Sequence, residues 1–206
     1  MASSRGCDAS RSALREGYLA LGARMGARQR ASVEHSVASH LRALPEYQAA
    51  TLVLGYLPFE REVDASLIMA NARKDGKRVA LPAFVGGDQS LAYYVVEEGA
   101  AIRRGSVGFP EPVVEEGARP IAPEDMAGAV CLVPGLVFDA CGYRVGYGAG
   151  YFDNFLRYFP GTTVGLAASV AVSGNPLPVD DHDMPVMVLV SDSAVWRSRQ
   201  RTELEG

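Results

Sequence analysis

Apolar residues return at helical spacing along the first 45 residues of the chain. From Ser10 onward roughly one residue in every three or four is apolar, which predicts a helix with one buried face. The apolar positions of this first helix are Leu14, Tyr18, Leu21 and Met25. A second helix ends at Pro45, and its predicted buried stripe is Val33, Val37, Leu41 and Leu44. Residues 1–9, which precede this pattern, are small and polar, and we predict a disordered tail there.

The spacing changes to short apolar runs after residue 50, and each run predicts a strand. Residues 51–57 (TLVLGYL) form a buried strand that ends at Pro58, and residues 77–81 (KRVAL) form the next, ended by Pro82. The helical segment 65–74 between them completes a strand–helix–strand unit, which favours parallel pairing through a right-handed crossover. Further strands are predicted at residues 90–96, 129–133, 163–167 and 186–190.

The predicted elements indicate an α/β fold, a three-layer α/β/α sandwich with a mostly parallel, Rossmann-like sheet. The 206 residues are enough for one substantial core, so we predict a single α/β domain over residues 10–206, with both N-terminal helices on one face of the sheet. Ligands of such sheets bind beyond the carboxyl ends of the strands, where we expect the cleft. Residues 97–128 show no periodicity and are predicted to be a surface excursion, in which Phe109 either lines a cleft or, the interpretation we prefer, pins the loop to the core.

The charge and the cysteine content exclude several classes of protein. A formal net charge of −4 and a pI near 5.4 give no general attraction to nucleic acid or to an anionic membrane, so any basic site is local. Three cysteines without C-x-x-C spacing support neither a disulfide framework nor a zinc site. No apolar run approaches the roughly 18 residues of a membrane span. We therefore expect a cytoplasmic protein without nucleic acid or membrane partners. Separately, we expect small-molecule partners and a monomer.

The rest of the chain is arranged around residues 133–156, VPGLVFDACGYRVGYGAGYFDNFL. This stretch contains the end of a buried strand, a polar, glycine-rich turn and the start of a helix. Glycines permit close approach of a ligand to backbone N–H groups, so the turn predicts a phosphate cradle. Its G-x-G-x-G spacing is neither the Walker nor the dinucleotide pattern. An ordinary long turn is the alternative, but Arg144 and Asp153 beside the glycines favour the functional interpretation.

Three further groups of charged residues are candidates for function. Arg11 and Arg15 stand at a helix start, where the helix dipole disfavours cations, and form either a solvated surface or an anion site. Glu62 directly follows a strand end, where ligands bind. An acidic cluster within residues 176–185 is either a solvated loop, the commoner case, or a metal site. Its members are Asp180, Asp181, His182 and Asp183.

The central loop resembles the signature of the 5-formyltetrahydrofolate cyclo-ligases, also called methenyltetrahydrofolate synthetases, which typically show PGLxFDxxGxRLGYGxGYYDxFL. Three weaker resemblances follow in the same order as in that family: RSALR at residues 11–15, EREVD at residues 60–64 and the pair His182-Asp183. Together they span nearly the whole chain and imply the cyclo-ligase (NagB/RpiA-like) variant of the α/β/α fold. They also imply an enzyme that converts 5-formyltetrahydrofolate to 5,10-methenyltetrahydrofolate with ATP and Mg²⁺, releasing ADP and phosphate.

By this resemblance the central loop and the first helix bind ATP and Mg²⁺. The residues implied for ATP are Arg11, Arg15, Gly146, Tyr147, Gly148, Ala149 and Gly150. Arg144 is the implied catalytic residue that stabilises charge on the transferring γ-phosphoryl group. Asp153 and Asp183 are the implied oxygen ligands of Mg²⁺.

The resemblance places the folate at a different strand exit. Leu57 and Glu62 are the implied folate-binding residues, and Glu62 accepts hydrogen bonds from the pterin. Tyr151 is implied to bind the substrate near the reacting centre and to act as a second catalytic residue.

The chain departs from the family pattern at several positions, and the changes accumulate on the folate side. They are Arg11 for lysine, Ala65 for threonine, Phe152 for tyrosine, Ala149, Asn154, Met187 and a missing glutamine within residues 165–172. These departures leave two alternatives open. One is a divergent ATP-dependent ligase for another formyl or carboxyl substrate, and the other is a non-catalytic nucleotide-binding regulatory module.

Overall fold

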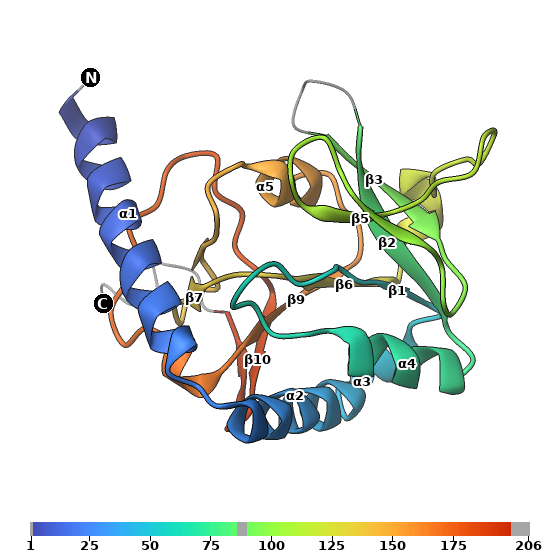
Figure 1. Ribbon diagram of the computed structural model, residues 1–206, viewed down its shortest axis with the longest axis horizontal. Coiled ribbons are helices and arrows are strands. Elements are labelled where there is room, and N and C mark those ends of the chain that lie inside the picture. Colours follow the sequence, from blue (N-terminus) through green and yellow to red (C-terminus); the bar gives the residue numbers. More distant parts are fainter. Residues whose placement is uncertain (1, 86–89, 199–206) are drawn as a thin grey trace.

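The computed structural model of the chain describes residues 2–85 and 90–198 and contains a seven-stranded, mostly parallel sheet (Figure 1). The strand order is β11-β10-β9-β6-β1-β2-β3, and the four pairings from β10 to β2 are parallel, whereas β3 and β11 pair antiparallel at the two edges. The strands are β1 (Leu52–Leu54), β2 (Arg78–Val85), β3 (Ser90–Val95), β6 (Val130–Val133), β9 (Thr162–Ala167), β10 (Val188–Ser191) and β11 (Val195–Arg197). The predicted α/β fold is therefore confirmed.

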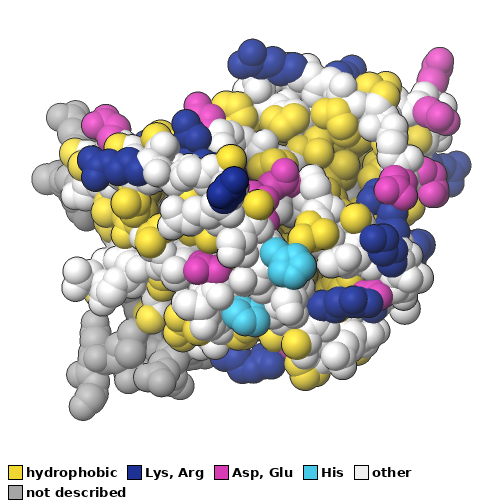
Figure 2. Space-filling view, turned by 60° about the horizontal axis from the view of Figure 1, so that its bottom comes forward, with side chains coloured by type: hydrophobic (Ala, Val, Ile, Leu, Met, Phe, Trp, Pro, Cys, Tyr) yellow, Lys and Arg dark blue, Asp and Glu magenta, His cyan; other side chains and the backbone are white. Residues whose placement is uncertain are grey.

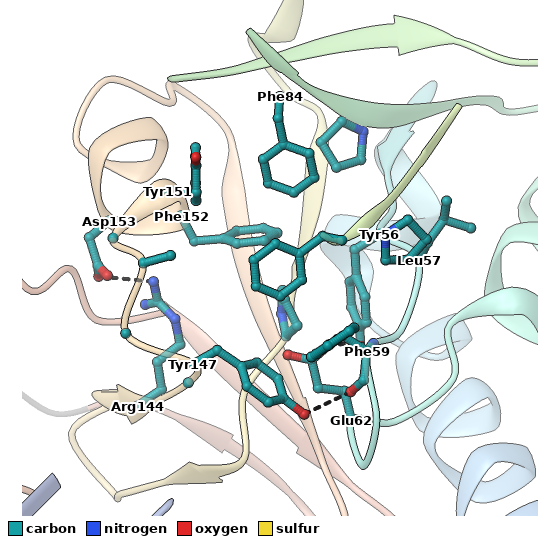
Figure 3. A pocket seen from close by; sticks show the side chains of 18 of the residues that line it. Tyr56, Leu57, Phe59, Glu62, Phe84, Arg144, Tyr147, Tyr151, Phe152 and Asp153 are labelled. Atoms are coloured by element: carbon teal, nitrogen blue, oxygen red, sulfur yellow. Dashed lines mark hydrogen bonds and ion pairs between the residues drawn. The ribbon is translucent and has the colours of Figure 1, made fainter. Parts of the chain in front are cut away.

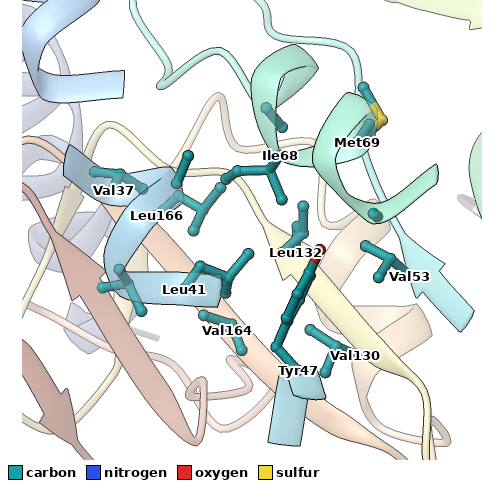
Figure 4. Close-up of a cluster of buried hydrophobic side chains, with 14 of the residues drawn as sticks. Val37, Leu41, Tyr47, Val53, Ile68, Met69, Val130, Leu132, Val164 and Leu166 are labelled. Atoms are coloured by element: carbon teal, nitrogen blue, oxygen red, sulfur yellow. The ribbon is translucent and has the colours of Figure 1, made fainter. Parts of the chain in front are cut away.

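Helices cover both faces of this sheet, and side chains alternate between two cores along each strand. Val53 and Leu132 point to one face, where α2 (Ala27–Arg42), α3 (Pro45–Ala49) and α4 (Ser66–Lys74) pack on them (Figure 4). Leu54 and Val133 point to the other face, covered by the short α5 (Tyr151–Leu156) and the 3₁₀ helix η1 (Pro123–Met126). Alternation with period two is what a sheet buried on both faces requires. Three layers result, as the hydrophobic pattern predicted.

The first helix, α1 (Ala2–Ala23), differs from its prediction in extent and position. It begins at Ala2, so residues 2–9, predicted as a disordered tail, are helical; Met1 and the end of the predicted domain, residues 199–206, lie outside the described residues. No proline occurs in residues 2–9, so nothing in the backbone stops the helix from continuing ahead of Ser10. The helix also leaves the sheet face to α2, because Leu14 and Tyr18 pack on a separate small cluster. That cluster consists of Val137, Val145 and Leu177.

Strand β2 runs through Pro82 to Val85, although the proline predicted its end. The N–H of Arg78 and the carbonyl of Ala80 face β1, so the nitrogen of Pro82 faces the same side. Strand β1 has already ended opposite Ala80, so a proline there costs no ladder hydrogen bond. The strand therefore projects beyond its parallel neighbour.

Two small hairpins lie outside the main sheet. Within the predicted excursion, β4 (Ile102–Arg104) pairs with β5 (Pro110–Pro112), and β5 lies against β2. In the central loop β7 (Val137–Phe138) pairs with β8 (Arg144–Val145). No helix within the described ranges 2–85 and 90–198 is long and apolar enough to cross a membrane.

Candidate active site

A pocket opens at the carboxyl ends of β1 and β2, between these strand exits, α1 and the central loop (Figure 3). Its position is the one expected for a ligand site in an open α/β sheet. The predicted site residues that line it are Arg11, Arg15, Leu57, Glu62, Arg144, Gly146, Tyr147, Gly148, Ala149, Gly150, Tyr151 and Asp153. Asp183 is the one predicted site residue outside this lining.

The glycine-rich turn is shaped from beneath by a buried carboxylate. Asp139, 2% exposed, accepts hydrogen bonds from the N–H groups of Cys141 and Tyr143 on one oxygen and from that of Leu177 on the other. These bonds fix the β7–β8 hairpin from which the turn begins. Asp139 is therefore structural, whereas the second carboxylate of the loop, Asp153, faces the pocket.

Arg144 is held rigidly at the edge of the pocket. Its side chain is 7% exposed, and its Nη2 donates to Oδ1 of Asp153 at 2.9 Å while its Nη1 donates to the carbonyl of Met184 at 2.7 Å. The N–H of Met184 donates to the same Oδ1 at 3.0 Å. A guanidinium fixed in this way needs no reorganisation to meet an anion.

Helix α1 brings two arginines to the turn. The Nε of Arg15 donates to the carbonyl of Gly146 at 2.8 Å, and a Cβ added at Gly148 would lie 3.0 Å from its Nη2. Gly148 has a φ of +89°, so a side chain there is disfavoured on two counts. Arg11 pairs with Asp180 at 2.8 Å and with Asp183 at 2.9 Å. Both arginines line the pocket, which favours the anion-site interpretation over a solvated surface.

The two predicted metal ligands stand in different surroundings. Asp183 accepts Arg11 on Oδ1 and the N–H of Asp180 on Oδ2. Asp153 uses Oδ1 for Arg144 and Met184, and its Oδ2 has no hydrogen bond to any part of the chain that the structure describes. Within that part, no group of three or more His, Cys, Asp or Glu side chains is arranged to hold a metal ion. A cation here would take Asp153 as its protein ligand and its other ligands from bound phosphates and water, as is common for Mg²⁺.

Glu62 is a buried carboxylate on the opposite wall of the pocket. It is 8% exposed, and its Oε2 accepts the N–H of Phe59 at 2.9 Å. Burial raises its pKa to about 7, and the Phe59 N–H and the charge of Arg144 act in the opposite direction. Glu60, in the same turn, has a φ of +49°, a strained conformation of the kind that clusters at functional sites.

Aromatic rings form the wall between Glu62 and the central loop. Phe59 meets both Phe109 and Tyr147 edge-on at 4.8 Å between ring centroids, and Phe84 meets Tyr151 at the same distance. The hydroxyl of Tyr147 donates to the carbonyl of Phe59 at 3.0 Å, which joins the two walls. We call these five residues the aromatic wall.

Sequence reasoning missed part of this wall. Phe109 lines the pocket, so of its two interpretations the one that we did not prefer is the one that the structure supports. Phe59 follows β1, and Phe84 lies near the end of β2. The rule that ligands bind at strand exits is the signal that could have identified both residues.

Comparisons with known proteins identify the family of this chain. A model of the 5-formyltetrahydrofolate cyclo-ligase family matches residues 7–192. The "probable 5-formyltetrahydrofolate cyclo-ligase" of Schizosaccharomyces pombe is 26% identical over 79% of this chain and 85% of its own length. The 5-formyltetrahydrofolate cyclo-ligase of Escherichia coli is 26% identical over 82% of this chain and 92% of its own length.

Solved structures extend the agreement to the fold. The Aquifex aeolicus 5,10-methenyltetrahydrofolate synthetase has a TM-score of 0.76 and 33% identity, covering 92% of this chain and 93% of its own. A 5,10-methenyltetrahydrofolate synthetase from Mycoplasma pneumoniae, 16% identical, has a TM-score of 0.68 over 88% of this chain and 98% of its own and supports the fold alone. The chain belongs to the 5-formyltetrahydrofolate cyclo-ligase family.

Proposed function

We propose that this protein cyclises 5-formyltetrahydrofolate to 5,10-methenyltetrahydrofolate, using ATP and Mg²⁺ and releasing ADP and phosphate. The observation that carries the proposal is one pocket with two unlike walls. The glycine turn presents backbone and the guanidinium groups of Arg15 and Arg144 on one side, and Glu62 stands with the aromatic wall on the other. A phosphorylated nucleotide and a fused-ring substrate would meet there.

The phosphate side suits phosphoryl transfer. In the proposed reaction the formyl oxygen attacks the γ-phosphorus, ADP leaves, N10 then attacks the activated carbon, and phosphate departs as the ring closes. Such transfer depends on positioning and charge neutralisation more than on a protein nucleophile. Arg144 would stabilise the charge that develops on the transferred group, while Arg11, Arg15 and residues 146–150 would hold the nucleotide.

Mg²⁺ would neutralise part of the negative charge of the nucleotide phosphates. We propose Asp153 as its protein ligand through Oδ2, because Oδ1 is engaged by Arg144 and Met184. Asp183 would contribute only if it exchanged Arg11 for the cation, since both of its oxygens already accept hydrogen bonds. In the geometry described, its proposed role is to position Arg11.

The folate side suits a reduced pterin. Leu57 and the aromatic wall would pack on its rings, and the carboxylate of Glu62 would accept its N–H hydrogen bonds, which an aromatic cage alone cannot do. Tyr151, at the junction of both walls, would pack beside the reacting carbon. Of the departures from the family pattern, Ala65 is fully buried and Met187 is 56% exposed, and neither lines the pocket, whereas Phe152 does.

We propose that the protein works as a cytoplasmic monomer on these small molecules, without nucleic acid or membrane partners. The acidic net charge supports the absence of nucleic-acid and anionic-membrane partners. On the face shown in Figure 2, basic and acidic side chains are interspersed, with no large patch of basic charge.

One experiment tests the function directly. The purified protein is incubated with 5-formyltetrahydrofolate, ATP and Mg²⁺, and the 5,10-methenyl chromophore is followed together with phosphate release. Both signals should appear and depend on all three components. Phosphate release without the chromophore would point to another formyl or carboxyl substrate, and nucleotide binding without either signal would point to a regulatory module.

A further inference from the structure

Glu111 is a buried carboxylate beside the pocket but outside its lining. It lies in β5, is 2% exposed, and pairs with Arg103 of β4 through Oε1 at 2.8 Å to Nη2. The Nε of Arg103 donates to the same oxygen at 2.9 Å. The second oxygen, Oε2, accepts the backbone N–H of Phe84 in β2 at 3.0 Å. One side chain therefore joins the β4–β5 hairpin to the main sheet.

The N–H of Phe84 needs this acceptor because of where β1 ends. Even-numbered residues of β2 direct their backbone groups toward β1, as the bonds of Arg78 and Ala80 show. In the described sheet β1 stops opposite Ala80, so no strand pairs with β2 on that side at Phe84. An N–H that is shielded from water and left without a partner destabilises the fold. The carboxylate of Glu111 replaces the missing strand.

The same carboxylate shapes the turn that carries Phe109. Gly105 lies directly over it, since a Cβ at Gly105 would be 2.8 Å from Cδ of Glu111. The N–H of Gly105 donates to the carbonyl of Phe109 at 2.8 Å and closes the turn. A side chain at position 105 would require the Glu111 carboxylate to shift, so turn and carboxylate form one unit.

Phe84 and Phe109 are the two rings of the aromatic wall that this unit controls. They stack at 5.6 Å between centroids with planes 25° apart. Phe109 then meets Phe59, and Phe84 meets Tyr151, so the pair is in contact with the rings on either side of it. The contacts of Glu111 therefore fix the wall from behind, without touching the pocket.

We propose that Glu111 is a positioning residue for the folate site: it fixes Phe84 and Phe109 and thereby sets the affinity for 5-formyltetrahydrofolate while leaving the nucleotide side unaffected. This rests on the proposed function. The nucleotide side is built from α1 and the central loop, neither of which Glu111 contacts among the bonds described.

The test compares the two Michaelis constants in Glu111→Ala. The KM for 5-formyltetrahydrofolate should rise about 10-fold or more, a change that corresponds to about 1.4 kcal/mol, while the KM for ATP stays within about 2-fold. The dissociation constant of 5-formyltetrahydrofolate alone, measured by calorimetry, should rise in parallel. A merely structural role would leave both KM values unchanged in the folded fraction or raise them together, and either result overturns the proposal.

Two further variants keep the test decisive. Glu111→Gln retains an acceptor for Phe84 and should fold if Glu111→Ala does not; its smaller rise should again be confined to the folate. Asp75→Asn is the matched control, because Asp75 also accepts an arginine, Arg42, but lies at the amino end of β2, away from the pocket. It should leave both KM values unchanged.

A double-mutant comparison tests the route through the wall. If Glu111 acts by placing Phe109, Phe109→Ala and Phe109→Ala/Glu111→Ala should have similar affinities for the folate, and additive losses would contradict that route. Wild-type turnover is measured in the same series. Its absence would refute the proposed function, whereas its presence with unchanged variants would refute only the role of Glu111.

Discussion

The buried carboxylate of Glu62, which we propose binds the substrate, lowers the stability of the fold when it is ionised. Burial raises its pKa to about 7, compared with an ordinary value of 4.5 that applies to the unfolded chain. Between these two pH values the folded state binds more protons than the unfolded state, so the free energy of unfolding falls as the pH rises from 4.5 to 7. The difference between the two pKa values corresponds to about 3 kcal/mol of stability, which the protein loses at higher pH, where the carboxylate is ionised.

We therefore expect Glu62→Gln to stabilise the protein in a pH-dependent manner. The difference in the free energy of unfolding between the variant and the wild type should grow by up to about 3 kcal/mol from roughly pH 4.5 to pH 8, because glutamine has no charge to bury. Urea denaturation of both proteins at these two pH values measures the increase, and effects common to both pH values cancel. The same variant should bind 5-formyltetrahydrofolate more weakly. A stability difference that does not change with pH would contradict the assignment.

Arg144 is expected to contribute to the transition state more than to binding. In Arg144→Ala, turnover should fall about 100-fold or more while the KM for ATP changes little, because a preorganised charge stabiliser acts where charge develops. Steady-state kinetics measure both quantities. Arg144→Lys retains the charge but cannot reach Asp153 and Met184 together, so it should be intermediate. Near-normal turnover in the alanine variant would show that the arginine has been misassigned.

The sequence was informative about residues that lie together in one motif, and less so about the others. Residues 144–153 follow one another along one loop, so spacing alone predicted that they share a site, and all of them except Val145 line the pocket. Spacing did not separate the roles of Asp139 and Asp153, because the direction of each side chain depends on the hairpin fold. Phe84 and Glu111 are 27 residues apart, and their hydrogen bond exists only because β1 ends early.

At the scale of elements, the sheet was easier to predict than its surroundings. Buried parallel strands are continuous apolar runs, and β1, β6 and β9 were recognised on that basis. The β4–β5 hairpin was missed, because two three-residue strands with two prolines show no periodicity. The predicted position of α1 was wrong, because the apolar stripe of a helix does not reveal which surface the helix packs on.

Helix α1 is the element that we expect to determine nucleotide affinity. In Arg15→Ala the KM for ATP should rise about 10-fold or more, since a hydrogen bond to a charged group contributes about 1.5–3 kcal/mol, and the KM for the folate should stay the same. Arg28→Ala is the matched control, because Arg28 is an exposed arginine at the start of α2. Equal KM values for ATP in the two variants would show that α1 does not contact the phosphates.

At the scale of the whole molecule, the pocket joins segments from nearly the full length of the chain. Arg11 comes from α1, Glu62 follows β1, Phe109 belongs to a hairpin, and Asp153 lies in the first turn of α5. The unfolded chain has no such site, so each ligand binds only the folded state. Ligand binding should then stabilise the entire fold by mass action.

Thermal unfolding with single ligands measures this coupling. At about 100 times its dissociation constant a ligand adds about 2.7 kcal/mol, which for a chain of this size raises Tm by about 5–10 °C. Mg²⁺ with ADP, and 5-formyltetrahydrofolate alone, should each produce such a shift. Chelating the metal at the same ADP concentration should reduce the nucleotide shift, because Asp153 and the diphosphate would no longer share a cation. In Asp153→Asn the chelator should make little difference, since the carboxylate that the cation requires is already absent; an undiminished response to chelation in that variant would place the metal elsewhere.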